Sequence, residues 1–179
     1  MRTRRSLMVL VVVLVATLAV GCAGTPSSMM RPRPTCSPPS SLPGQTVFVM
    51  LGDTGMARMM SGAAPAVTPL TLQAVPARLP AGVISFVVRN MGLHTHEMVV
   101  LPLPDGRAAG RRETTGDGRV DEAGSLGEAS ASCAAGSGEG IAAGAAGWVT
   151  LDLRPGRYEL VCNLRDHYVD GMHHLFTVS

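Results

Sequence analysis

Three side chains that can bind a metal ion lie close together near the C-terminal end of the chain. Cys162, His167 and Met172 are separated by two gaps of four residues each. One short segment therefore offers a thiolate, an imidazole and a thioether. Blue copper sites combine two imidazoles and one Cys thiolate with a weak axial Met, so this segment supplies all of such a site except one imidazole.

The second imidazole can come from a pair of His residues further upstream. His94 and His96 are separated by one residue, so both point to the same face if the chain is extended there. His96 begins the apolar run at 98–100 and is the better anchored of the two. We therefore expect His96 to be the remaining ligand, with His94 as the alternative.

Each candidate ligand also has an ordinary structural interpretation. A single Cys or Met often packs in a core, and a lone His is often a polar group without a ligand. Zinc is the main chemical alternative, because it binds Cys, His and carboxylate ligands and would leave Met172 without a role. The combined spacing favours copper, which binds both thiolate and thioether sulfur.

Further donor groups lie outside this set. His173 and His174 follow Met172 directly, and we expect solvent-exposed strand residues, with a weaker second metal site as the alternative. Four Met residues near the first expected strand either fill the core, which we favour, or hold Cu(I). They are Met50, Met56, Met59 and Met60.

The elements that must position these residues are short strands separated by Gly and Pro turns. Residues 83–90 and 148–153 alternate between apolar and polar positions, as half-buried strands do. A turn at 154–157 leads to a hairpin partner at 158–162, so Cys162 ends a strand. The other expected strands are 47–51, 66–72, 96–102 and 175–178. Because no long helical period is present, the sequence predicts an all-β sandwich.

The stretch at 105–147 interrupts this pattern. It consists mostly of Ala, Gly, Ser, Arg and acidic residues, which predicts a long central loop insertion with a short helix near 122–129. Such loops are uncommon unless they are functional or pinned. Cys133 lies in this loop, and we expect a disulfide with Cys36 in an oxidising compartment; two free thiols are the alternative.

The N-terminal end has the features of an export signal. Residues 1–21 combine a basic start with an apolar run shorter than the ~20 residues of a membrane-spanning helix. The run ends in a segment that resembles a bacterial lipoprotein processing site, so we expect lipidation of Cys22; an ordinary signal peptide with an incidental Cys22 is the alternative. Residues 22–44 are rich in Pro, Ser and Thr and are expected to tether a single domain at 45–179.

The charge balance gives no sign of nucleic-acid binding. The full chain has 15 basic and 13 acidic residues, and the basic residues are all Arg. Removal of residues 1–21 takes away three Arg and leaves 158 residues (179 − 21) with a net charge of −1 (12 − 13). A nearly neutral surface lacks the basic patch that binds a phosphate backbone.

The sequence around the Cys resembles the cupredoxin superfamily of the plastocyanin and azurin type. The likeness extends over about 45–179 and is closest to bacterial exported forms with the motif Cys-Asn-Leu-Pro-Gly-His-Tyr. It is carried by 155–163, His167, Tyr168, Gly171, Met172, 81–97 and 120–130. The resemblance implies a Greek-key β-sandwich that binds one copper ion through His96, Cys162, His167 and Met172. Arg165 and Asp166 replace the Pro-Gly of the motif, which makes the loop more polar.

Two Asn residues are expected to lie next to the ligands and to orient them. Asn163 follows Cys162 and is expected to hydrogen-bond near the sulfur, which tunes such sites. Asn90 ends the strand that precedes the His pair.

These features predict a type 1 copper protein that carries single electrons and is not an enzyme. The alternative is an exported copper chaperone or buffer that binds Cu(I) and hands it over. Expected partners are redox or copper-handling proteins. We expect a monomer that is lipid-anchored at the outer face of the cytoplasmic membrane, where a tether raises its local concentration.

Overall fold

The computed structural model describes residues 36–53 and 70–179. In these residues the chain forms nine β-strands and no helix. The strands are β1 (Gln45–Gly52), β2 (Thr71–Val75), β3 (Arg78–Leu79), β4 (Gly82–Asn90), β5 (Met98–Pro102), β6 (Gly127–Ala129), β7 (Ala146–Leu153), β8 (Gly156–Val161) and β9 (His173–Val178). The all-β class predicted from the sequence is confirmed.

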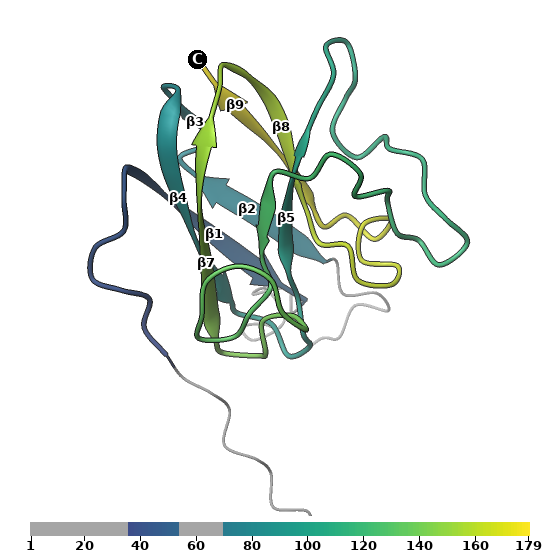
Figure 1. The fold of residues 1–179 in the computed structure, drawn as a ribbon. Helices are drawn as coiled ribbons and strands as arrows, with labels where there is room; N and C mark the ends of the chain where they lie inside the picture. The colour runs from purple at the N-terminus through teal and green to yellow at the C-terminus, as the bar shows by residue number, and fades with distance from the viewer. Residues whose placement is uncertain (1–35, 54–69) are drawn as a thin grey trace, which may run out of the picture. The chain divides into compact units, whose positions relative to one another are not determined.

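The strands form two sheets (Figure 1). One sheet has the order β2-β1-β4-β7, and the other has the order β3-β9-β8-β5-β6. Most neighbouring strands are antiparallel, but β1 runs parallel to β4 and β3 runs parallel to β9. The chain crosses between the sheets after β2, β3, β4, β6 and β7, as it does in sandwiches with Greek-key connections.

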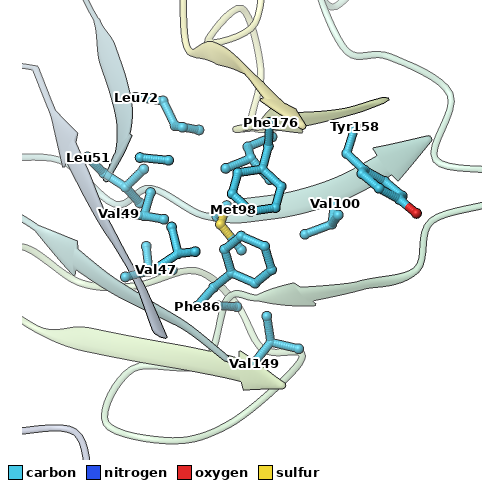
Figure 2. Packing of buried hydrophobic residues seen from close by; sticks show 14 of the residues in the cluster. Val47, Val49, Leu51, Leu72, Phe86, Met98, Val100, Val149, Tyr158 and Phe176 are labelled. Atoms are coloured by element: carbon cyan, nitrogen blue, oxygen red, sulfur yellow. The ribbon is translucent and has the colours of Figure 1, made fainter. Parts of the chain in front are cut away.

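The core lies between the two sheets (Figure 2). Ile84, Phe86 and Val88 of β4 are fully buried, as their alternation predicts. The ring of Phe86 meets the ring of Phe176 from β9 edge to face, with 5.2 Å between the ring centroids. Burial of a large apolar side chain contributes about 1.5–3 kcal/mol. This packing fixes the two sheets against each other and so fixes the loops at their ends.

Several local predictions need correction. The short helix expected near 122–129 is absent, because Gly124 and Gly127 have φ values of +85° and +148° and Gly127–Ala129 forms β6 on the edge of β5. The strand expected at 66–72 is found at Thr71–Val75, and 66–69 lie outside the described residues. The two-residue strand β3 was not predicted.

The additional His and Met residues that could bind a metal also differ from expectation. His173 and His174 do lie in a strand, but both are half-buried rather than solvent-exposed. Met50 is exposed on β1 and therefore does not fill the core. Met56, Met59 and Met60 lie outside the described residues.

The expected disulfide joins the central loop to the segment before β1. Cys36 and Cys133 are bonded, with 5.6 Å between their Cα atoms. The Ser85 hydroxyl of β4 donates to the carbonyl of Pro43 at 2.6 Å. The stretch at 36–44, assigned to the tether from its composition, thus lies against the domain. The expected export signal, Cys22 and the rest of the expected tether lie outside the described residues. Among the residues described, no helix is long and apolar enough to cross a membrane.

Candidate metal centre

The pairing of β5 with β8 brings His96 next to Cys162. The two strands are antiparallel, with Val99 opposite Val161, so the start of β5 lies beside the end of β8. The backbone N–H of Glu97 donates to Cys162 Sγ at 3.4 Å, across a sequence separation of 65 residues. A long-range strand pairing therefore delivers the upstream imidazole to the thiol.

The central loop fixes the backbone of His96. The N–H of His96 donates to the Ile141 carbonyl at 3.1 Å, and the Ile141 N–H donates to the His96 carbonyl at 2.6 Å. The side chain of His96 is fully buried. The imidazole is thus held in place from both sides of the residue.

The connection between β8 and β9 carries the other candidate ligands. The N–H of Cys162 donates to the Met172 carbonyl, and the N–H of Met172 donates to the His167 carbonyl, both at 3.0 Å. Asp166 and Gly171 have φ values of 63° and 105°. Asp tolerates this left-handed region and Gly adopts it freely, so these two residues allow the loop to turn back on itself.

Three ligand atoms converge at this end of the sandwich. His96 Nδ1 lies 3.2 Å from His167 Nδ1, which lies 3.3 Å from Cys162 Sγ. All three ligand atoms lie within 4.8 Å of one another. Ligand atoms that are each about 2.0–2.3 Å from one ion have comparable spacings. The structure therefore brings together three of the four predicted ligands.

Met172 lies beside this group. Its side chain is fully buried and belongs to the same core cluster as Cys162. Its backbone is hydrogen-bonded to both Cys162 and His167. Met172 is therefore placed next to two candidate ligands, and its role as the axial ligand stays a prediction.

Burial determines the protonation of the three converging side chains. It lowers the pKa of His96 to about 4, with a further decrease from the neighbouring His167, and it lowers the pKa of His167. Both imidazoles are therefore neutral at pH 7 and can offer a lone pair. Burial raises the pKa of the Cys162 thiol to about 12, so a bound cation must displace its proton.

The donor set fits copper better than zinc. A structural zinc site needs four strong ligands, usually Cys, His or carboxylate. Among the described residues, the cluster contains one thiol and two imidazoles and no carboxylate. A trigonal Cys and His₂ set with a thioether nearby is the arrangement of a type 1 copper site.

The two upstream His residues have different environments. The side chain of His94 is 78% exposed, and its Nδ1 is hydrogen-bonded to the carboxylate of Asp53. His96 is buried in the cluster. The structure therefore favours His96 over His94 as the ligand.

Asn90 orders the segment that carries these two His residues. Its side-chain amide donates to the carbonyls of His94 and Ile141, each at 2.7 Å. Its Oδ1 accepts the N–H of Gly92 at 2.8 Å. Asn90 is thus placed where it can orient the upstream ligand through the backbone.

Asn163 has a different role from the expected one. Its Oδ1 accepts the Val120 N–H at 2.7 Å, and its amide donates to the Glu122 carboxylate at 2.6 Å. The side chain therefore anchors the central loop. The Cys162 sulfur instead faces backbone N–H groups, that of Glu97 at 3.4 Å and that of Leu164.

Glu97 is a buried carboxyl beside the thiol. Its Oε1 accepts the Asn163 N–H at 3.1 Å. Burial, with the carboxylates of Glu122 and Glu128 nearby, raises its pKa from 4.5 to about 7. The folded state therefore holds the Glu97 proton more tightly than the unfolded state does. This tighter proton binding stabilises the folded protein fully below pH 4.5, and the stabilisation is lost as the pH rises to about 7.

We therefore expect Glu97→Gln to stabilise the metal-free protein selectively at high pH. The gain in free energy of unfolding over the original chain should be larger at pH 8 than at pH 4.5 by about 3 kcal/mol. Urea unfolding at both pH values measures this difference. Glu128→Gln is the control: it removes one neighbouring charge and should give only part of the gain. An equal effect of Glu97→Gln at both pH values would contradict the account.

A buried hydrogen-bond network links the ligand loop, residues 162–172, to the central loop. The carboxylate of Glu159 is fully buried and accepts the Gly110 N–H at 2.5 Å and Arg112 Nε at 2.6 Å. It also accepts the hydroxyl of Tyr168, the residue after His167, at 3.0 Å. The Tyr168 hydroxyl in turn accepts the Arg112 N–H at 3.0 Å. The central insertion therefore supports the metal-binding loop.

Four residues of the site were not predicted from the sequence. The sequence could have indicated Glu97 and Tyr168, because each directly follows a candidate ligand. No feature of the sequence indicated Asp53 and Glu159, because their contacts depend on which strands lie side by side.

Comparisons with known proteins give likenesses in solved structures. No protein-family model and no curated protein matches the chain. Auracyanin B is 23% identical, with 78% of this chain and 91% of that chain covered and a TM-score of 0.45. Auracyanin from the photosynthetic bacterium Roseiflexus castenholzii is 14% identical, with 76% and 98% covered and a TM-score of 0.46. The copper protein rusticyanin is 18% identical, with 76% and 79% covered and a TM-score of 0.45.

Proposed function

We propose that this chain is a cupredoxin that holds one type 1 copper ion and carries single electrons. The observation that carries the proposal is the convergence of one ligand atom each from His96, Cys162 and His167 within 4.8 Å of one another. Soft sulfur suits Cu(I), and imidazole serves both oxidation states. We also propose that the protein is not an enzyme.

The residues of the chain would hold the metal in one geometry through both oxidation states. His96, Cys162 and Met172 are fully buried, whereas His167 is only half-buried. The copper supplies the one-electron couple when it is bound. The strand ends and the closed loop limit movement of the ligands, and the imidazole of His167 is the ligand nearest to solvent. We therefore assign His167 as the edge at which electrons enter and leave.

The proposed location is outside the cytoplasm. The Cys36–Cys133 disulfide supports this location, because disulfides persist in oxidising compartments. We further propose that residues 1–21 are removed, that a lipid on Cys22 anchors a monomer to the outer face of the cytoplasmic membrane, and that the partners are redox proteins there. Such anchoring would raise the encounter frequency with membrane-bound partners.

Copper retention separates electron transfer from copper handover. The copper-loaded protein is cycled between reductant and oxidant in the presence of a Cu(I) chelator of modest affinity, and bound copper is counted after each cycle. An electron carrier keeps its copper through the cycles, because three of the four proposed ligands are fully buried. Loss of copper in the first reduced phase would instead identify a protein that delivers Cu(I).

The axial assignment is tested by Met172→Leu. We expect the coloured site to remain and the reduction potential to rise, because a hydrocarbon replaces a weak ligand of Cu(II). The volume is conserved, so the free energy of unfolding should change by less than about 1.5 kcal/mol. Protein voltammetry and the visible spectrum measure the effect.

Met98→Leu is the matched control, because Met98 is equally buried in the same core cluster and is not one of the proposed ligands (Figure 2). It should leave the potential near its original value. Complete loss of copper in Met172→Leu, or equal shifts in the two variants, would rule out the axial role.

A further inference from the structure

Asp53 is a buried carboxylate at the end of β1 that faces the segment before β5. Only 5% of its surface is exposed. Its Oδ1 accepts the Leu93 N–H at 2.7 Å, and its Oδ2 accepts the His94 N–H at 2.8 Å. Burial alone would raise the pKa of Asp53, but these two N–H donors, a hydrogen bond between Oδ2 and His94 Nδ1 and the nearby His96 hold that pKa below its usual value. The group is therefore an anion at neutral pH.

The carboxylate also lies on the far side of the His96 ring from the metal-binding cluster. His96 Nδ1 points toward His167, while His96 Nε2 lies 3.5 Å from Asp53 Oδ2. Nε2 is buried and has no hydrogen-bond partner among the described residues. A neutral imidazole that offers Nδ1 to a metal must carry its proton on Nε2, and that N–H requires an acceptor.

The fold places this acceptor through a strand pairing far from the ligands in sequence. β1 runs parallel to β4, with Leu51 opposite Asn90, so both strands end at the same edge of the sheet. Asp53 then lies next to the turn after Asn90. A Cβ on Gly92 would come within 2.6 Å of Asp53 Oδ1 and 3.0 Å of His96 Nε2. The absence of a side chain at Gly92 therefore allows the carboxylate to approach the imidazole.

We propose that Asp53 is the positioning residue of the upstream ligand: it accepts the Nε2 proton of His96 and so directs Nδ1 to the metal. This inference rests on the proposed function. In metal sites, a carboxylate behind a ligating imidazole fixes its tautomer and orientation and increases its basicity. The negative charge should also favour Cu(II) over Cu(I).

The first test is on the metal-free full chain and does not depend on copper. Nitrogen-15 NMR of the imidazoles reports which nitrogen of His96 carries the proton. We expect the Nε2–H tautomer in the original chain, and a larger share of the Nδ1–H tautomer in Gly92→Ala, which displaces the carboxylate and leaves every charge in place. An Nδ1–H tautomer in the original chain would overturn the proposal.

The second test compares Asp53→Asn with Asp170→Asn, which removes an exposed carboxylate of the ligand loop. Asp53→Asn should weaken Cu(II) binding roughly 10- to 100-fold and raise the reduction potential. Asp170→Asn should have a much smaller effect on both. Equal Cu(II) affinities in the two variants would overturn the proposal.

The outcomes for Asp53 and for the proposed function can be told apart. If the original chain forms no coloured copper site, the proposed function fails, and the tautomer of the metal-free chain still decides whether Asp53 pairs with His96. If the original chain is coloured and Asp53→Asn behaves like Asp170→Asn, the role of Asp53 alone fails. If Asp53→Asn does not fold, the tautomers of the original chain and of Gly92→Ala decide.

Discussion

Cys162→Ala should abolish the intense visible absorption of the copper-loaded protein. The absorption requires a thiolate bound to copper, and Cys162 is the one free Cys among the described residues. Any remaining copper would be held by imidazoles alone, with a weak spectrum. The thiol is fully buried, so the change should also lower the free energy of unfolding of the metal-free protein by about 1 kcal/mol through lost packing. Visible spectroscopy and urea unfolding measure the two effects.

Cys162→Ser separates loss of the ligand from loss of packing. Ser keeps nearly the same volume and removes the soft sulfur, so its copper spectrum should match that of Cys162→Ala. A persistent thiolate band in either variant would show that another Cys binds the metal and would remove Cys162 from the site.

His96→Ala and His94→Ala should have opposite outcomes although the residues are two positions apart. His96 is fully buried with its Nδ1 in the cluster, so its loss should eliminate the type 1 spectrum. The cavity should also destabilise the metal-free protein by about 2–4 kcal/mol. The side chain of His94 is 78% exposed and lies outside the cluster, so His94→Ala should keep the spectrum.

His96→Leu is the matched control for the cavity. It fills most of the space without a nitrogen ligand, so it should restore stability and leave the copper site colourless. Visible spectra and urea unfolding of the three variants decide the assignment. Loss of colour in His94→Ala with colour kept in His96→Ala would exchange the two roles.

The sequence predicted the parts of this fold that depend on local pattern. Alternation at 83–90 matches β4 (Gly82–Asn90). The hairpin partner expected at 158–162 is β8 (Gly156–Val161), so Cys162 directly follows the strand instead of being its last residue. The grouping of Cys162, His167 and Met172 could be predicted because all three lie in the one connection between the hairpin strands β8 and β9. In so short a segment, residues close in sequence are also close in space.

The remaining features depend on contacts between distant segments. Asp53 reaches His96 only because β1 is parallel to β4, and Glu159 reaches Arg112 only because the central loop folds over β8. Composition suggested a helix near 122–129, but pairing with β5 and two Gly residues with positive φ give an edge strand instead. Local propensity is outweighed there by the open edge of the sheet.

The central insertion shows why an apparently featureless segment can matter for the site. Its Ile141 forms backbone hydrogen bonds with His96, and its Val120 N–H donates to the side chain of Asn163. Arg112 also completes the buried group around Glu159 under the ligand loop. A Gly-rich composition that predicts only a loop therefore conceals hydrogen bonds to both halves of the site.

The most direct test of the copper assignment is the visible and electron paramagnetic resonance spectrum of the purified protein during addition of Cu(II). We predict an intense blue or green thiolate-to-copper band that saturates at one copper per chain, bleaches with reductant and returns with oxidant. A protein that develops no such band, or that holds copper only as Cu(I), would contradict the assignment of a type 1 electron-transfer site.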